Sequence, residues 1–299
     1  MRTRFKPDRG LTGRMLATAF LLGLLYVVFV AVLITLTKSA FIAIVLAGAV
    51  LFSQYWFSDR IALYAMRGRV VTPEQAPQLH GVIDRLCALA DMPKPAVAVA
   101  DADMPNAFAT GRSPGRAVVC VTTGLLRRLD TDELEGVLAH ELSHVAHRDV
   151  AVMTIASFLG VLAGLMTRFG LYAGVGGRSR DQNAAVVVMT VVLVSEVVYA
   201  LSFLLTRALS RYRELAADRS SAVLTGRPSA LASALTKVSG EIARIPTRDL
   251  RQAEAFNAFF FVPALSRGFS LSSLFATHPP LQRRLDHLAA IARQLGEQG

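Results

Sequence analysis

Two long stretches near the N-terminus of the 299-residue chain contain no charged side chain and are mostly apolar. They cover residues 15–37 and 39–58, and only Lys38 separates them. A helix needs about 20 apolar residues to cross a hydrocarbon core, so each stretch is long enough to span a membrane. Both exceed the roughly 7–15 apolar residues of a signal peptide. The pattern predicts a retained transmembrane hairpin within residues 1–58.

Basic residues are concentrated before the first span, whereas the tip of the hairpin carries only Lys38. The positive-inside rule therefore predicts that the N-terminus and the chain after residue 58 lie in the cytoplasm. In this compartment we expect Cys87 and Cys120 to be reduced thiols in a core rather than a disulfide. Their spacing matches no metal motif.

Two further apolar stretches occur in the second half of the chain. Residues 150–167 carry no charge, and residues 182–206 contain Glu196 as their one charged residue. We interpret them as a second membrane hairpin, residues 150–206. The alternative is a pair of helices buried against the protein or lying in the interface, because the loop between them contains arginines on the disfavoured side. For Glu196 we favour a polar contact that faces the helix bundle.

The remaining segments alternate between helix and strand patterns. Residues 72–89 have apolar positions at helical spacing, and residues 96–100 and 117–122 have the alternation or valine content of strands. Helical patterns return at 208–224, at 229–238 and after residue 277. We predict a mainly α membrane protein with a small β-sheet and about four transmembrane helices. Residues 59–149 and 207–299 would form one cytoplasmic domain.

A capped helix is predicted from Thr131 onward. Asp130 is a typical N-cap, and Glu133 lies three residues later, as in a capping box. No proline or glycine follows Gly136 until Gly160. The helix is therefore expected to run directly into the apolar stretch that begins at residue 150.

This helix carries the motif His-Glu-Leu-Ser-His at residues 140–144. Residues four apart lie on the same face of a helix, so His140 and His144 can bind one ion. Imidazole nitrogens suit zinc, and Glu141 is placed to act on water at the metal. The chain has only six histidines, so a chance match is of order one in a hundred. We predict one zinc ion per chain at this motif.

A catalytic zinc usually has three protein ligands, so a third must come from elsewhere. His147 lies on the same helical face, but seven residues of helix span about 10.5 Å, too far for one ion. We interpret His147 as a residue near the membrane surface. Glu214 is the stronger candidate, and Asp218 could accept a hydrogen bond from a ligand histidine. By themselves, a glutamate and an aspartate four residues apart are typical of a helix surface. The predicted second hairpin, however, would bring the helix of Glu214 and Asp218 beside the helix of residues 140–144.

Together these segments resemble the HtpX family of membrane-embedded metalloproteases, relatives of the CAAX prenyl endopeptidases. The resemblance covers nearly the whole chain, without departure at the motif positions, and is carried by the N-terminal hairpin, residues 105–111, 140–144, 214–218 and 277–280, and Arg284. It implies a zincin-like, gluzincin-type catalytic domain with Glu214 as the third zinc ligand. It also implies a bacterial cytoplasmic-membrane endopeptidase that degrades misfolded or damaged membrane proteins.

For some further residues more than one role is open. Asn106, Ala107 and Phe108 mark the end of a predicted exposed edge strand, which in the family pairs with an extended substrate; the alternative is an ordinary strand end. His278 could stabilise an oxyanion, act as a gate or cap the last helix. Arg284 is a candidate structural partner of the site.

The net charge of +10 at first suggests a nucleic-acid partner. The arginines are scattered beside apolar runs without a nucleic-acid motif, so we expect contacts with lipid headgroups instead.

Phe256 and the phenylalanines at 259–261 fit core packing better than a substrate groove. We expect protein substrates and membrane lipids as partners, no nucleic acid, and leave a homo-oligomer open. The competing functions are a non-catalytic zinc-containing scaffold and a narrow-specificity processing protease.

Overall fold

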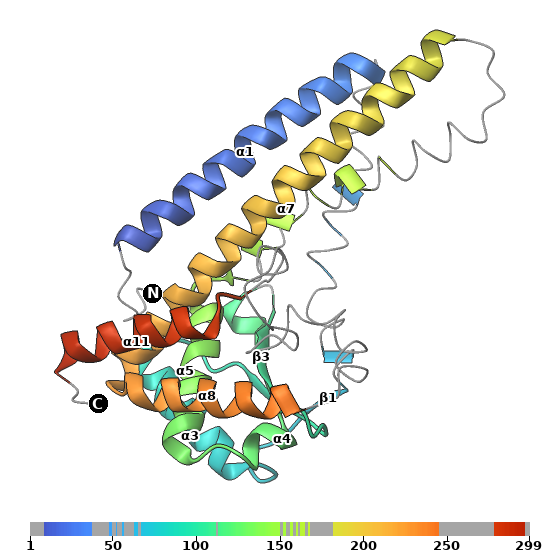
Figure 1. Cartoon of the computed structure of the whole chain (residues 1–299). Helices are drawn as coiled ribbons and strands as arrows, with labels where there is room; N and C mark the ends of the chain where they lie inside the picture. The colour runs from blue at the N-terminus through green and yellow to red at the C-terminus, as the bar shows by residue number, and fades with distance from the viewer. Residues whose placement is uncertain are drawn as a thin grey trace. The chain divides into compact units, whose positions relative to one another are not determined.

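The computed structural model describes five long segments and some isolated residues between them (Figure 1): residues 9–37, 67–111, 113–149, 182–244 and 278–296, with isolated residues within 48–64 and 152–167. Most of the predicted span at 39–58 and half of the predicted span at 150–167 lie outside the described residues, as do Thr277 and the phenylalanines at 256 and 259–261.

The chain divides into two compact units. The first combines Met1–Gly13, Phe57–Ala151 and Ser210–Gly299, and the second combines Arg14–Trp56 and Val152–Leu209. Residues that are distant in sequence thus meet in the first unit, which contains the motif at 140–144.

A four-stranded mixed sheet lies in the first unit, in the order β1-β2-β4-β3. β1 (Gly68–Val70) is antiparallel to β2 (Ala96–Ala100), and β2 is parallel to β4 (Val118–Thr122). β3 (Ala107–Thr110) pairs with β4 in the antiparallel direction and forms one edge of the sheet. Alternate residues face opposite sides of a strand, so Val97 and Val99 of β2 and Val119 and Val121 of β4 join the main core, while Ala98, Ala100 and Cys120 pack on the other face.

Helices complete the first unit around this sheet: α3 (Pro77–Ala90), α4 (Thr123–Leu126), α5 (Thr131–Ala146), α8 (Pro228–Arg244) and α11 (Leu281–Leu295). Leu138 and Leu142 of α5 are fully buried against the core that also contains Leu231 and Leu235 of α8. The helix predicted over residues 72–89 begins later, at Pro77, because residues 73–75 form a separate turn and Ala76 has a non-helical backbone, with φ of −142° and ψ of 62°.

The predicted capping box of α5 is confirmed. The Glu133 amide donates to Asp130 Oδ1 at 2.9 Å, and the Asp130 amide donates to Glu133 Oε2 at 3.0 Å. The predicted run of this helix into the next apolar stretch is wrong. α5 ends at Ala146, because Arg148 adopts a left-handed conformation with φ of 55°.

The apolar stretch at 182–206 and the polar helix at 208–224 form one continuous helix, α7 (Gln182–Thr225). In the second unit α7 packs against α1 (Arg9–Thr37) through Phe29, Val191 and Val198. Glu196 is exposed on α7, whereas the sequence pattern favoured a contact facing the bundle. Its apolar neighbours Leu193 and Val197 are also exposed.

Two described helices are long and apolar enough to cross a membrane, judged by length and composition. They contain the segments Arg9–Val32 of α1 and Val186–Thr225 of α7. Large apolar side chains such as Phe20 and Leu24 of α1 are exposed, as expected for a surface that contacts lipid. The described chain is thus mostly helical, with a small mixed sheet and two candidate membrane helices.

Gly136 lets α5 and α8 approach closely. A Cβ atom at Gly136 would lie 3.2 Å from the amide nitrogen of Leu231, whereas one at Gly81 of α3 would meet nothing within 4 Å. We expect Gly136→Val to destabilise the protein by about 1–3 kcal/mol through overpacking. Gly81→Val should change stability by less than about 0.5 kcal/mol. The thermal unfolding midpoints of both variants in detergent test this, and equal midpoints would contradict the close contact.

Candidate metal centre

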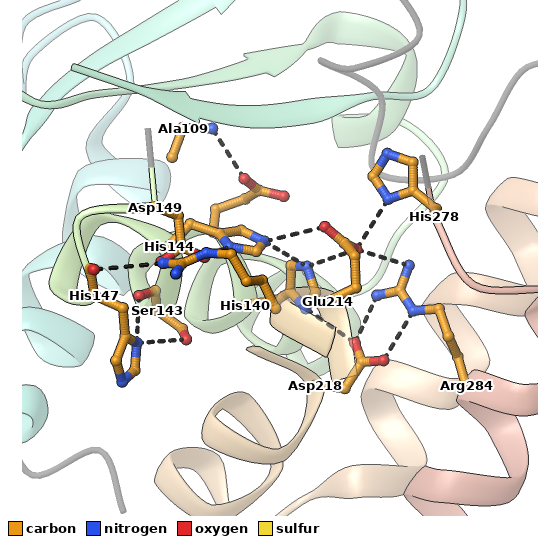
Figure 2. A network of polar contacts seen from close by, with 12 residues as sticks. Ala109, His140, Ser143, His144, His147, Asp149, Glu214, Asp218, His278 and Arg284 are labelled. Atoms are coloured by element: carbon orange, nitrogen blue, oxygen red, sulfur yellow. Dashed lines mark hydrogen bonds and ion pairs between the residues drawn. The ribbon is translucent and has the colours of Figure 1, made fainter. Parts of the chain in front are cut away.

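α5 presents His140 and His144 one helical turn apart, with their Nε2 atoms facing each other at 3.1 Å. The two rings are nearly perpendicular, with centroids 4.8 Å apart. His140 is buried and the side chain of His144 is 15% exposed. Both imidazoles therefore direct a nitrogen toward the same enclosed point (Figure 2).

Glu214 reaches this point from α7. Its Oε1 lies 3.5 Å from His144 Nε2, and its Oε2 lies 3.6 Å from His140 Nε2. The donor atoms of the three residues all lie within 4.8 Å of one another. The structure thus brings together the two histidines and the carboxylate singled out in the sequence.

The spacing of these donors fits a zinc ion. Zinc binds nitrogen and oxygen at about 2.0–2.2 Å, so a tetrahedral arrangement places its ligand atoms about 3.4 Å apart. The separations of 3.1, 3.5 and 3.6 Å bracket this value. Each histidine also has an aspartate oxygen close to its Nδ1, which favours a proton there and leaves the Nε2 lone pair directed inward.

Asp218 is the aspartate beside His140. Its Oδ1 lies 3.0 Å from His140 Nδ1, the contact expected from the sequence. Arg284 of α11 donates to both oxygens of Asp218, from Nε at 2.8 Å and from Nη2 at 2.6 Å. Asp218 and Arg284 are 0% and 2% exposed. A bidentate, fully desolvated pair therefore fixes the carboxylate that orients His140.

Asp149 is the aspartate beside His144, at 2.6 Å from Oδ2 to Nδ1. Its other oxygen pairs with Arg213, which also donates to the carbonyl of His147 at 3.4 Å. Neither Asp149 nor Arg213 was assigned a role from the sequence. The signal that could have found Asp149 is a carboxylate five residues after the second histidine, just past the end of the motif helix.

Glu141 is buried and interacts electrostatically with His140, His144 and Glu214. Its Oε2 accepts a hydrogen bond from the backbone amide of Ala109 in β3 at 2.9 Å. Burial raises the pKa of the Glu141 carboxyl above its ordinary value, and this effect outweighs the lowering by His140, His144 and the Ala109 amide. A carboxylate with a raised pKa is better suited to accept and return a proton near neutral pH.

The segment at Asn106, Ala107 and Phe108 is an edge as predicted, but its side chains are not exposed. The strand itself runs over Ala107–Thr110, and the three side chains are buried. The Asn106 carbonyl accepts the amide of Thr122, and its amide donates to the Thr122 hydroxyl. Ala109, whose amide meets Glu141, is the strand residue nearest the chemistry.

His278 contacts Glu214, with Nδ1 3.0 Å from Oε2. The N-cap of α11 is Pro280, so His278 does not cap this helix. His147 lies at the end of α5, where its Nδ1 is 2.8 Å from the carbonyl of Ser143. It does not belong to the group of converging donors found among the described residues.

A His-Glu-x-x-His helix beside a sheet edge, completed by a glutamate from another helix, is typical of a metal-dependent peptidase. A family model for peptidase family M48 matches residues 73–292. Protease HtpX homolog 1 from Streptomyces coelicolor is 67% identical over 297 residues, 99% of this chain and 98% of that protein. Protease HtpX homolog from Moorella thermoacetica is 53% identical over 298 residues, 99% of each chain.

The fold has a relative among solved structures. The crystal structure of S. mikatae Ste24p is similar with a TM-score of 0.54 at 18% sequence identity, over 89% of this chain and 62% of that chain.

The family-model match and the HtpX relatives show that the chain belongs to peptidase family M48 and, within it, to the HtpX metalloproteases.

The buried pair of Asp218 and Arg284 leads to a prediction about stability. Arg284→Met leaves a buried carboxylate without its main counter-ion, which should cost about 3–5 kcal/mol. Arg283→Met is the matched control, because Arg283 is the exposed neighbour in α11. The thermal unfolding midpoint in detergent should fall sharply for Arg284→Met and little for Arg283→Met. Equal midpoints would show that the pair does not stabilise this site.

Proposed function

We propose that the chain is a zinc endopeptidase in which His140, His144 and Glu214 hold one zinc ion. The observation that carries this proposal is the convergence of their donor atoms within 4.8 Å beside Glu141. A structural zinc site is usually closed by four protein ligands, commonly including cysteine. Cys87 and Cys120 lie instead in the hydrophobic clusters of the sheet, where burial raises the pKa of their thiols to about 11 and about 12. The donor set therefore favours a catalytic site over a scaffold.

A zinc ion bound there supplies Lewis acidity, which acidifies water and polarises the scissile carbonyl group. Glu141 is the general base: it accepts the proton of the attacking water and later gives it to the leaving amine. Its raised pKa and its place beside the ligand atoms support both steps. His278, in contact with Glu214, is the side chain we propose to stabilise the developing negative charge on the substrate oxygen.

The edge strand β3 is the proposed binding surface for the substrate backbone. Along an antiparallel strand, successive residues direct their main-chain groups alternately toward and away from the partner strand. The Ala109 amide meets Glu141 rather than β4, so Ala109 and, by alternation, Ala107 turn their main-chain groups to the free edge. Main-chain pairing at this edge gives sequence-tolerant recognition of an extended peptide.

We further propose that the substrates are misfolded or damaged membrane proteins, cleaved at the cytoplasmic face of a bacterial membrane. The apolar helices α1 and α7 support membrane attachment. α7 also carries Glu214, so one helix connects an apolar segment with the metal centre. Recognition through main-chain groups suits substrates that share exposed, extended segments rather than a sequence motif.

Glu141→Gln separates metal binding from catalysis. The amide cannot accept a proton, so hydrolysis of casein or of an unfolded membrane protein should fall by at least 100-fold. Zinc content should stay near one ion per chain, because Glu141 is not among the converging donors. Elemental analysis and a peptide-release assay on the same sample test both points. Turnover by this variant at the wild-type rate would contradict the proposed base.

Removal of the metal should abolish cleavage and loosen the site. Without a cation, the donors of His140, His144 and Glu214 face one another in a buried space. We expect a chelator to stop casein hydrolysis and to lower the unfolding midpoint, and added zinc to restore both. Proteolysis that persists after complete metal removal would contradict a metal-dependent mechanism. Zinc that restores the midpoint but no cleavage of any protein substrate would favour the scaffold.

A further inference from the structure

Each histidine of the motif has its own aspartate on the nitrogen that faces away from the metal centre. His140 Nδ1 lies 3.0 Å from Asp218 Oδ1, and His144 Nδ1 lies 2.6 Å from Asp149 Oδ2. Each aspartate in turn pairs with a buried arginine, Arg284 for Asp218 and Arg213 for Asp149. Two series of contacts of the same chemistry, histidine to aspartate to arginine, thus meet at the ligand atoms. Figure 2 shows the series of His140, Asp218 and Arg284.

The backbone after α5 places Asp149 for this contact. α5 ends at Ala146, and the left-handed conformation of Arg148 turns the chain so that the Asp149 side chain reaches the His144 ring. The Asp149 side chain is 11% exposed and that of Arg213 is 6% exposed. The two oxygens of Asp149 are divided between their partners, Oδ2 for His144 and Oδ1 for Arg213.

Arg213 also joins the two helices that supply the metal ligands. It precedes Glu214 in α7, and it donates to the carbonyl of His147 at the end of α5. The same turn of α7 therefore holds the counter-ion of Asp149 and the third donor of the centre. A displacement of Asp149 would alter the direction of the His144 ring.

We propose that Asp149 is the positioning residue for His144, with Arg213 as its counter-ion. Asp149 accepts a hydrogen bond from the Nδ1–H of His144, which keeps the Nε2 lone pair directed at the metal and makes the imidazole a stronger donor. This inference rests on the proposed zinc site. Asp149 would orient the ring of His144 as Asp218 orients that of His140. Each ligand ring is then held by a hydrogen bond as well as by the metal.

Zinc affinity tests this role independently of activity. The full-length protein in detergent would carry Glu141→Gln, so that no proteolysis accompanies the measurement. The test variant is the double substitution Asp149→Ala with Arg213→Met, since it avoids leaving an unpaired buried guanidinium. Competition with a chromogenic chelator should show a 10- to 100-fold weaker zinc affinity than in the parent. The visible spectrum of the cobalt-substituted protein should change as well, because the ring of a metal ligand is no longer fixed.

Two controls separate positioning from a structural effect. Asp103→Ala with Arg127→Met removes another aspartate–arginine pair, exposed and outside the metal centre, and should leave zinc affinity unchanged. In a His144→Ala background, loss of Asp149 and Arg213 should weaken zinc binding no further, because the residue through which they act is already gone.

Three results would overturn the inference. One is a zinc affinity of the test variant within twofold of the parent. Another is an equal loss of affinity in the His144→Ala background, which would indicate a structural role. The third is a wild-type protein without stoichiometric zinc, which would overturn the proposed function together with this inference. The first two would leave the proposed zinc endopeptidase in place.

Discussion

The structure of the site depends on the convergence of two imidazoles and one carboxylate on a single buried point. Such groups lose their hydration on burial, and they repel one another unless a cation or a proton lies between them. The buried charged residues in and around the site also carry more acidic than basic groups. Four carboxyl groups stand against two guanidinium groups: Glu141, Asp149, Glu214 and Asp218 against Arg213 and Arg284. A divalent cation at the ligand atoms would supply the missing positive charge.

The fold achieves this convergence by combining segments that are far apart in sequence. α5 supplies the motif, α7 supplies Glu214 and its neighbours, and α11 supplies the arginine that holds Asp218. The rigid sheet adds β3, whose Ala109 amide holds Glu141 at 2.9 Å. Each group that would act on a substrate is therefore positioned by a second group from a different element, which is how a site keeps its geometry during a reaction.

Local features of this site could be predicted from the sequence because a few neighbouring residues determine them. The capping box at Asp130 and Glu133 and the one-turn spacing of His140 and His144 are examples of this kind. The third donor, Glu214, required a topological argument together with the family resemblance. The end of α5 was missed because no glycine or proline marks it; Arg148 adopts the left-handed conformation instead. Asp149 was missed for the same reason, since a continuous helix would have carried it away from His144.

The most direct test of the account is zinc K-edge X-ray absorption on the full-length Glu141→Gln protein. The proposed centre predicts nitrogen and oxygen ligands at about 2.0–2.2 Å, with the multiple-scattering signal of two imidazoles. In His144→Ala the signal should correspond to one imidazole. Sulfur at about 2.3 Å, or a spectrum without imidazole, would show that His140, His144 and Glu214 do not form the metal centre.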